Sequence, residues 1–190
     1  LGPDAGALGP RMTWDPLSRT EPRYTRGMPT PFPAESFADV IEANREFAAD
    51  FAFAGQPGWA QRGLAIVTCM DSRISPLAVV GMEAGDAKIL RNAGARVTED
   101  VLRTLVLASY LLGVERILVM PHTDCRMAQA QEPEIHATIA EQYGVDTRSL
   151  EFRTVTDQRA ALITDVTRIR SFPLIPDTVA VAGAIYDVHT

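Results

Sequence analysis

From residue 36 to the C-terminus, short apolar runs alternate with segments whose apolar residues recur every three or four positions. Apolar runs bounded by turn residues are typical of buried strands, whereas the longer spacing is typical of helices with one buried face. The predicted strands cover residues 64–69, 87–94, 115–121 and 178–188. The predicted helices cover residues 36–51, 98–113, 133–144 and 156–171. Strands that alternate with helices form βαβ units, so this pattern predicts an α/β fold with a mainly parallel β-sheet flanked by helices.

The ends of two predicted helices carry recognisable signals. Thr98 precedes two acidic residues at the start of the helix over residues 98–113, and Gly113 suits its end. Ser36 is a plausible N-cap for the helix over residues 36–51. Both boundaries are therefore predicted from the residues themselves.

Residues 1–35 differ from the rest of the chain. They contain seven of the 13 prolines and show neither helical nor strand periodicity. Proline fixes φ and removes a backbone donor, so this segment is predicted to be an extended N-terminal arm. The remainder, residues 36–190, is of the length of one domain, and we expect a single α/β domain there.

Composition and charge exclude several classes of partner. The formal net charge of −6 does not suit nucleic acid, because phosphate binding needs a basic face. No apolar run approaches the roughly 20 residues of a membrane span. The N-terminal segment also lacks the apolar core of a signal peptide. We therefore expect a cytoplasmic protein that binds neither nucleic acid nor membrane.

The two cysteines and one of the three histidines follow predicted strands. Cys69 ends the strand over residues 64–69, while His122 and Cys125 come directly after the strand over residues 115–121. The carboxyl ends of parallel strands meet at one edge of the sheet, where ligands bind. Two thiolates and one imidazole suit zinc, and three protein ligands leave a fourth position open, as in catalytic sites. The simpler alternative is that both cysteines are buried thiols.

A carboxylate and a guanidinium lie on the turn after Cys69. Asp71 can accept the proton of a zinc-bound water, orient that water or occupy the open position, and Arg73 can hold Asp71 ionised through a bidentate pair. The alternative is that Asp71 caps the next helix and that Arg73 is a solvated charge. His136 and His189 have no cysteine nearby in the sequence and are expected to be surface or packing residues.

Two separated motifs resemble the signatures of the β-class carbonic anhydrases. They are Cys-x-Asp-x-Arg, present as CMDSR at residues 69–73, and His-x-x-Cys, present as HTDC at residues 122–125. The connecting segment and the closing AVAGAIYDVHT are also similar to the family, so the resemblance runs from about residue 63 to the C-terminus. Within the family, the chain looks most like the short, actinobacterial-type members.

The resemblance implies a zinc lyase that hydrates carbon dioxide reversibly to bicarbonate and a proton. It implies one Zn²⁺ per chain, held by Cys69, His122 and Cys125, with Asp71 and Arg73 as the catalytic dyad. It further implies a homodimer, in some members paired into tetramers, with N-terminal arms wrapped over the partner.

Three questions stay open at this stage. Hydrolases of carbonyl sulfide or carbon disulfide share the fold and the ligand set. A non-catalytic zinc-binding or thiol-redox module is a further alternative, since Asp71 could supply a fourth zinc ligand. Arg126 replaces the glycine that family members often have after the final cysteine. That glycine can serve a left-handed backbone or leave room above the metal, and Arg126 can narrow the mouth, attract bicarbonate or point to solvent.

Overall fold

The structure is a computed structural model that describes residues 33–190. The chain divides into two compact units, Leu1–Gln56 and Pro57–Thr190. Most of the predicted N-terminal arm lies outside the described residues, and its boundary at residue 35 stays a prediction. The described part of the first unit contains the 3-10 turn η1 (Ala34–Phe37) and the helix α1 (Ala38–Ala49).

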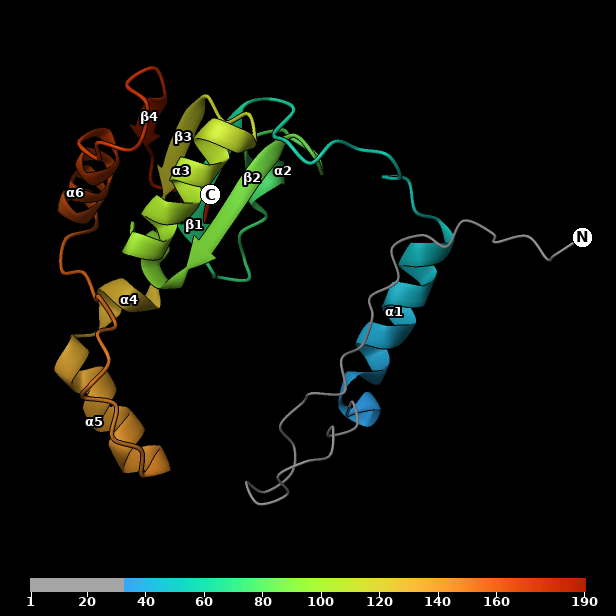
Figure 1. Ribbon diagram of the computed structural model, residues 1–190. Helices are drawn as coiled ribbons and strands as arrows, with labels where there is room; N and C mark the ends of the chain where they lie inside the picture. The colour runs from blue at the N-terminus through green and yellow to red at the C-terminus, as the bar shows by residue number, and fades with distance from the viewer. Residues whose placement is uncertain (1–32) are drawn as a thin grey trace, which may run out of the picture. The chain divides into compact units, whose positions relative to one another are not determined.

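The second unit is built on a four-stranded sheet in which every pairing is parallel (Figure 1). In sheet order the strands are β2 (Ala87–Asn92), β1 (Leu64–Cys69), β3 (Arg116–Met120) and β4 (Ala180–Gly183). The other elements are α2 (Pro76–Val79), η2 (Ala93–Ala95), α3 (Glu99–Leu111), α4 (Arg126–Gln129), α5 (Glu132–Tyr143) and α6 (Gln158–Arg170). The predicted parallel sheet flanked by helices is confirmed.

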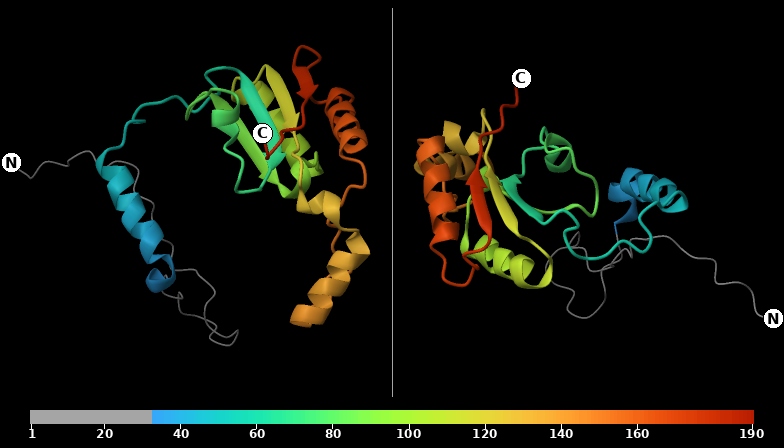
Figure 2. Two further views of the ribbon diagram at one scale, coloured as in Figure 1. Left: turned by 180° about the vertical axis from the view of Figure 1, so that it is seen from behind. Right: turned by 90° about the horizontal axis from the view of Figure 1, so that it is seen from above.

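The two faces of the sheet are covered by different elements. Ala65 and Val67 of β1 belong to a core shared with α3 and α6, whereas Ile66 belongs to a second core that contains Ile74 and Met127. This division follows from the alternation of side chains along a strand. Figure 2 shows α6 beside β4 in both of its views. Every residue of β1 is buried, as expected for a central strand covered on both faces.

Most predicted helices agree with the structure, and Thr98 does cap α3, where its side chain accepts a hydrogen bond from the Val101 amide at 3.4 Å. The predicted cap at Ser36 was wrong. Ser36 lies inside η1, and the N-cap position of α1 is Phe37, with no side-chain cap bond. A 3-10 turn precedes the helix and moves its start two residues along the chain. Within residues 33–190, no helix is long and apolar enough to cross a membrane.

The last predicted strand is shorter than its apolar pattern indicated. The pattern covers residues 178–188, but the ladder of β4 ends at Gly183. A single parallel bridge between Tyr186 and His122 continues the pairing beyond it. The C-terminal segment therefore lies beside the loop that follows β3.

The core of the second unit depends on α3. Leu105 on this helix has no exposed surface. Leu105→Ala is expected to lower the free energy of unfolding by about 2–5 kcal/mol, because it removes buried methyl groups and leaves a cavity. Leu150→Ala is the control, since the Leu150 side chain is 55% exposed, and it should cost less than about 0.5 kcal/mol. Urea unfolding measures both, and equal losses would contradict the assignment of Leu105 to the core.

Candidate metal centre

Three potential metal ligands meet at the carboxyl edge of the sheet. Cys69 is the last residue of β1, His122 follows β3, and Cys125 occupies the N-cap position of α4. All three side chains are buried, and their ligand atoms all lie within 4.8 Å of one another. The two Sγ atoms are 4.0 Å apart. Of the histidines and cysteines within residues 33–190, these three form the cluster that the strand order predicted.

The hydrogen bonds of His122 leave one ring nitrogen available. Its Nδ1 lies 2.7 Å from the carbonyl oxygen of Thr123. A carbonyl can only accept, so Nδ1 carries the proton, and in the neutral ring Nε2 then presents a lone pair. Nε2 is buried and has no hydrogen-bond partner. A buried nitrogen without a partner is costly, and a metal ion between it and the two sulfurs would remove that cost.

The surroundings of the two thiols affect how readily they lose their protons. The amide of Gly94 donates to Cys69 Sγ at 3.4 Å. Burial raises the pKa of the Cys125 thiol, and the nearby sulfur of Cys69 raises it further. A bound divalent cation has the opposite effect, because a coordinated thiol is deprotonated. The donor set therefore fits zinc, which takes thiolate and imidazole ligands in tetrahedral sites.

Gly94 also permits a close approach between two elements of the site. Its φ is +77°, and a Cβ atom there would lie 3.2 Å from Met127 Cβ on α4. Both the backbone conformation and the short distance favour glycine. This contact brings η2 close to the helix that begins after Cys125.

Asp71 and Arg73 form the predicted pair. Arg73 donates from Nε to Asp71 Oδ1 at 3.0 Å and from Nη2 to Oδ2 at 2.7 Å, and its amide also donates to Oδ1 at 2.9 Å. These bonds lower the pKa of Asp71 well below its usual range and raise that of Arg73. The alternative of a helix cap was wrong, since the N-cap of α2 is Ser75. Asp71 Oδ2 lies 3.7 Å from His122 Nε2, beside the candidate ligands.

Three further residues support the site, and sequence reasoning did not single them out. Arg73 also donates to Asp124 Oδ2 at 2.8 Å. Arg91 donates to the carbonyl oxygen of Cys69 at 2.8 Å, and Gln158 Nε2 donates to that of His122 at 2.7 Å. Asp124 lies inside the HTDC motif, which was a signal in the sequence. Gln158 lies on a distant helix, and no local pattern indicated its contact.

The two other histidines and Arg126 lie outside the cluster of candidate ligands. His136 bonds Thr147 Oγ1 at 2.8 Å and packs against the ring of Phe152, and His189 is exposed. Arg126 is exposed as the first residue of α4 and has no left-handed φ. The left-handed conformation near the motif belongs instead to Asp124, with φ +55°. Of the alternatives for Arg126, the orientation toward solvent agrees with the structure.

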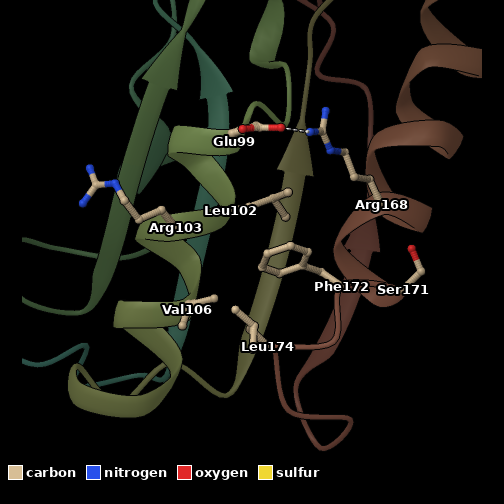
Figure 3. Close-up of a pocket in the computed structure, with 8 residues that line it drawn as sticks. All are labelled: Glu99, Leu102, Arg103, Val106, Arg168, Ser171, Phe172 and Leu174. Atoms are coloured by element: carbon tan, nitrogen blue, oxygen red, sulfur yellow. Dashed lines mark ion pairs between the residues drawn. The ribbon is translucent and has the colours of Figure 1, made fainter.

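A groove of about 510 Å³ lies elsewhere in the same unit, between α3 and α6 (Figure 3). Apolar side chains of α3 and of the segment that follows α6 line it, and the ion pair between Glu99 and Arg168, with 3.8 Å between charged atoms, closes one end. None of the three candidate ligands lines this groove. The groove is therefore not part of the candidate metal centre.

Comparison with known proteins identifies the family. The family model for carbonic anhydrases matches residues 64–190. β-Carbonic anhydrase 1 of Mycobacterium tuberculosis is 32% identical to this chain over 155 residues, which cover 80% of this chain and 92% of that relative. The chain belongs to the β-carbonic anhydrase family. The resemblance noted in the two motifs is thereby confirmed.

The family assignment extends to the fold and includes two named activities. A crystal structure of carbonic anhydrase from Streptococcus mutans is 38% identical, with a TM-score of 0.76, and the match covers 81% of this chain and 93% of that one. Carbon disulfide hydrolase of Acidithiobacillus thiooxidans is 28% identical over 167 residues, with 73% of this chain and 83% of the relative covered. An enzyme of the carbonic anhydrase type is therefore supported, on a fold that carbon disulfide hydrolases share.

Proposed function

We propose that this β-carbonic anhydrase family member hydrates carbon dioxide reversibly to bicarbonate and a proton, with one Zn²⁺ per chain held by Cys69, His122 and Cys125. The observation that carries the proposal is the buried, unpartnered Nε2 of His122, grouped with two buried thiols. Membership of a family of zinc enzymes supports the metal. Three protein ligands leave a fourth position for water, which agrees with catalysis rather than a purely structural role.

The metal and the chain supply different parts of the chemistry. When bound, zinc supplies a Lewis acid that lowers the pKa of a coordinated water toward about 7. The chain supplies the ligand geometry: the Nδ1–H bond from His122 to Thr123 selects the tautomer in which Nε2 carries the lone pair, and it fixes the ring orientation. Gln158 holds the same residue through its backbone carbonyl.

Asp71 is proposed to orient the attacking water, and Arg73 to orient Asp71. Arg73 keeps the carboxylate ionised, so Asp71 can accept a hydrogen bond and leave a lone pair of the water directed at the carbon of the substrate. The bidentate geometry also directs the carboxylate toward the guanidinium. Asp71 Oδ2 lies 3.7 Å from His122 Nε2, close enough to the proposed metal position to accept a hydrogen bond from the water.

Hydrolysis of carbon disulfide or carbonyl sulfide is the second candidate. It is supported by the relative named carbon disulfide hydrolase, which covers 73% of this chain. Carbon dioxide is favoured because the relatives named β-carbonic anhydrase are more similar, at 32% identity, than those named carbon disulfide hydrolase, at 28–29%. The same ligands serve either substrate, so only a measurement of rates separates the two.

The deciding experiment combines metal analysis with rate measurements on the purified protein. We expect about one zinc per chain by mass spectrometry, and stopped-flow hydration of carbon dioxide well above the uncatalysed rate. Carbon disulfide and carbonyl sulfide are assayed in parallel by sulfide release. Sulfide release without carbon dioxide hydration would support the second candidate. Bound zinc without either activity would support a non-catalytic module.

We further propose a cytoplasmic homodimer, with residues 1–35 packed on the neighbouring subunit. Large apolar side chains exposed on α3 support an interface: Leu107, Tyr110 and Leu111 are 46%, 62% and 70% exposed. The two free cysteines agree with a reducing compartment. Light scattering is expected to report a dimer at micromolar concentration, and deletion of residues 1–35 should weaken it. A stable monomer would contradict the proposal, and cell fractionation tests the compartment.

A further inference from the structure

The residues of the candidate site lie on two separate segments. The first consists of Cys69 at the end of β1 and the β1–α2 turn, residues 70–75, with Asp71 and Arg73. The second is the β3–α4 loop, residues 121–125, with His122 and Cys125. The bonds between Asp71 and Arg73 lie within one turn. They fix the carboxylate relative to its own turn, but none of them reaches the β3–α4 loop.

Asp124 adds a side-chain connection between the two segments, beyond the pairing of β1 with β3. Arg73 donates from Nη1 to Asp124 Oδ2 at 2.8 Å and from Nη2 to the Asp124 carbonyl oxygen at 3.2 Å. A guanidinium has five N–H donors in a fixed plane, so Arg73 can serve Asp71 and Asp124 at once, with different hydrogens. The two carboxylates therefore do not compete for the same donor.

Asp124 is itself held in place by a hydrogen bond from α4 and by its backbone conformation. Gln129 Nε2 on α4 donates to Asp124 Oδ1 at 2.5 Å. The backbone of Asp124 has φ +55°, a conformation that aspartate, asparagine and glycine tolerate better than most residues. Asp124 also lies in the sequence between the two candidate ligands His122 and Cys125. Because Asp124 lies between these two ligands, its bond to Arg73 fixes the guanidinium relative to them.

We propose that Asp124 is a positioning residue, which fixes Arg73 and through it the Asp71 carboxylate relative to the metal ligands. This inference rests on the proposed function, because the carboxylate needs a fixed position only if it orients a reacting water. Asp124 is not one of the candidate metal ligands, and its carboxylate bonds Arg73 and Gln129. It acts through the guanidinium alone.

The test uses variants chosen for the backbone conformation of Asp124. Asp124→Gly removes the side-chain acceptor without strain at positive φ, and Asp124→Asn keeps an acceptor oxygen. Asp146→Gly is the matched control: Asp146 is paired with Arg148 two residues later at 2.7 Å, as Asp71 is with Arg73, but both lie outside the candidate site. Each variant is made in the full chain, loaded with zinc, and compared with the unchanged protein.

Two readouts are expected to change together. Asp124→Gly should lower kcat/KM for carbon dioxide by about 10-fold at full zinc content, since a small displacement of a catalytic group costs this much or more. Hydrogen exchange of residues 70–75 should become faster. Asp124→Asn should retain most of both properties, and Asp146→Gly should change neither.

Arg73→Ala separates positioning from a general structural role. If Asp124 acts through Arg73, Asp124→Gly should have almost no further effect on exchange of residues 70–75 in the Arg73→Ala background. An undiminished effect there, or unchanged exchange and kcat/KM in Asp124→Gly alone, would overturn the proposal. If the unchanged protein fails to hydrate carbon dioxide, the proposed function fails, and the exchange data still decide whether Asp124 holds the turn.

Discussion

Replacing Cys125 with serine is expected to remove most of the zinc and most of the activity together. Cys125 is buried, and its sulfur lies 4.0 Å from that of Cys69. A serine hydroxyl is a far poorer zinc ligand than a thiolate, and the two remaining ligands leave the ion without a tetrahedral set. We expect zinc affinity to fall by more than about 100-fold, the upper end of losses seen when only the orienting partners of ligands are changed.

Metal content by mass spectrometry and carbon dioxide hydration by stopped flow measure this effect. Arg126→Ala is the control, because Arg126 is the exposed neighbour of Cys125 and is not a ligand in this proposal. It should bind zinc as the unchanged protein does. Circular dichroism shows whether each variant is folded. A folded Cys125→Ser protein with full zinc and full activity would rule out the proposed ligand set.

Replacing Asp71 with alanine is expected to leave the zinc in place and remove most of the turnover. The three proposed ligands are unchanged, so the metal stays bound. The water loses its hydrogen-bond acceptor, and the Arg73 guanidinium loses the carboxylate with which it makes its shortest bond, at 2.7 Å. We expect kcat to fall by about 100-fold or more, a typical contribution of a positioned general acid or base.

The control for this variant is Asp146→Ala, which removes an aspartate of the same pairing pattern. It should retain the hydration rate of the unchanged protein. Zinc content is measured in both variants. A zinc-loaded Asp71→Ala protein with a near-normal rate would show that the pair has no catalytic role.

The pH dependence of the pair follows from the direction of the pKa shift. The hydrogen bond from the Arg73 side chain lowers the pKa of Asp71 in the folded protein. The stability that this pair contributes is therefore complete above the unfolded value of about 3.9 and is lost only as the pH falls further. Loss of activity between about pH 8 and 6 would then report the coordinated water rather than Asp71, because the water is expected to titrate near 7 and the lowered pKa of Asp71 lies far below that range.

Short-range patterns in the sequence predicted the elements on which the site depends. The apolar run that ends at Cys69 matches β1 residue for residue, because a central strand in a parallel sheet is apolar along its whole length. The grouping of Cys69 with His122 followed from strand direction, since parallel strands end at one edge. Asp71 and Arg73 lie two residues apart, so their pairing was also local.

Other features depended on how distant segments pack. Two short helices, α2 and α4, have too few residues to show a period. The ladder of β4 ends at Gly183, although the apolar pattern continues to residue 188, and beyond it a single bridge pairs Tyr186 with His122.

By itself, the sequence determined the parallel α/β order, the cluster of two cysteines and one histidine, and the pair of Asp71 with Arg73. Only the tertiary structure decided which other side chains hold these groups: Asp124 for Arg73, and Gln158 for the loop of His122. The physical reason is that periodicity and spacing report interactions within a few residues of chain. A hydrogen bond across 36 or 51 residues depends on the packed positions of two segments, which no local pattern encodes.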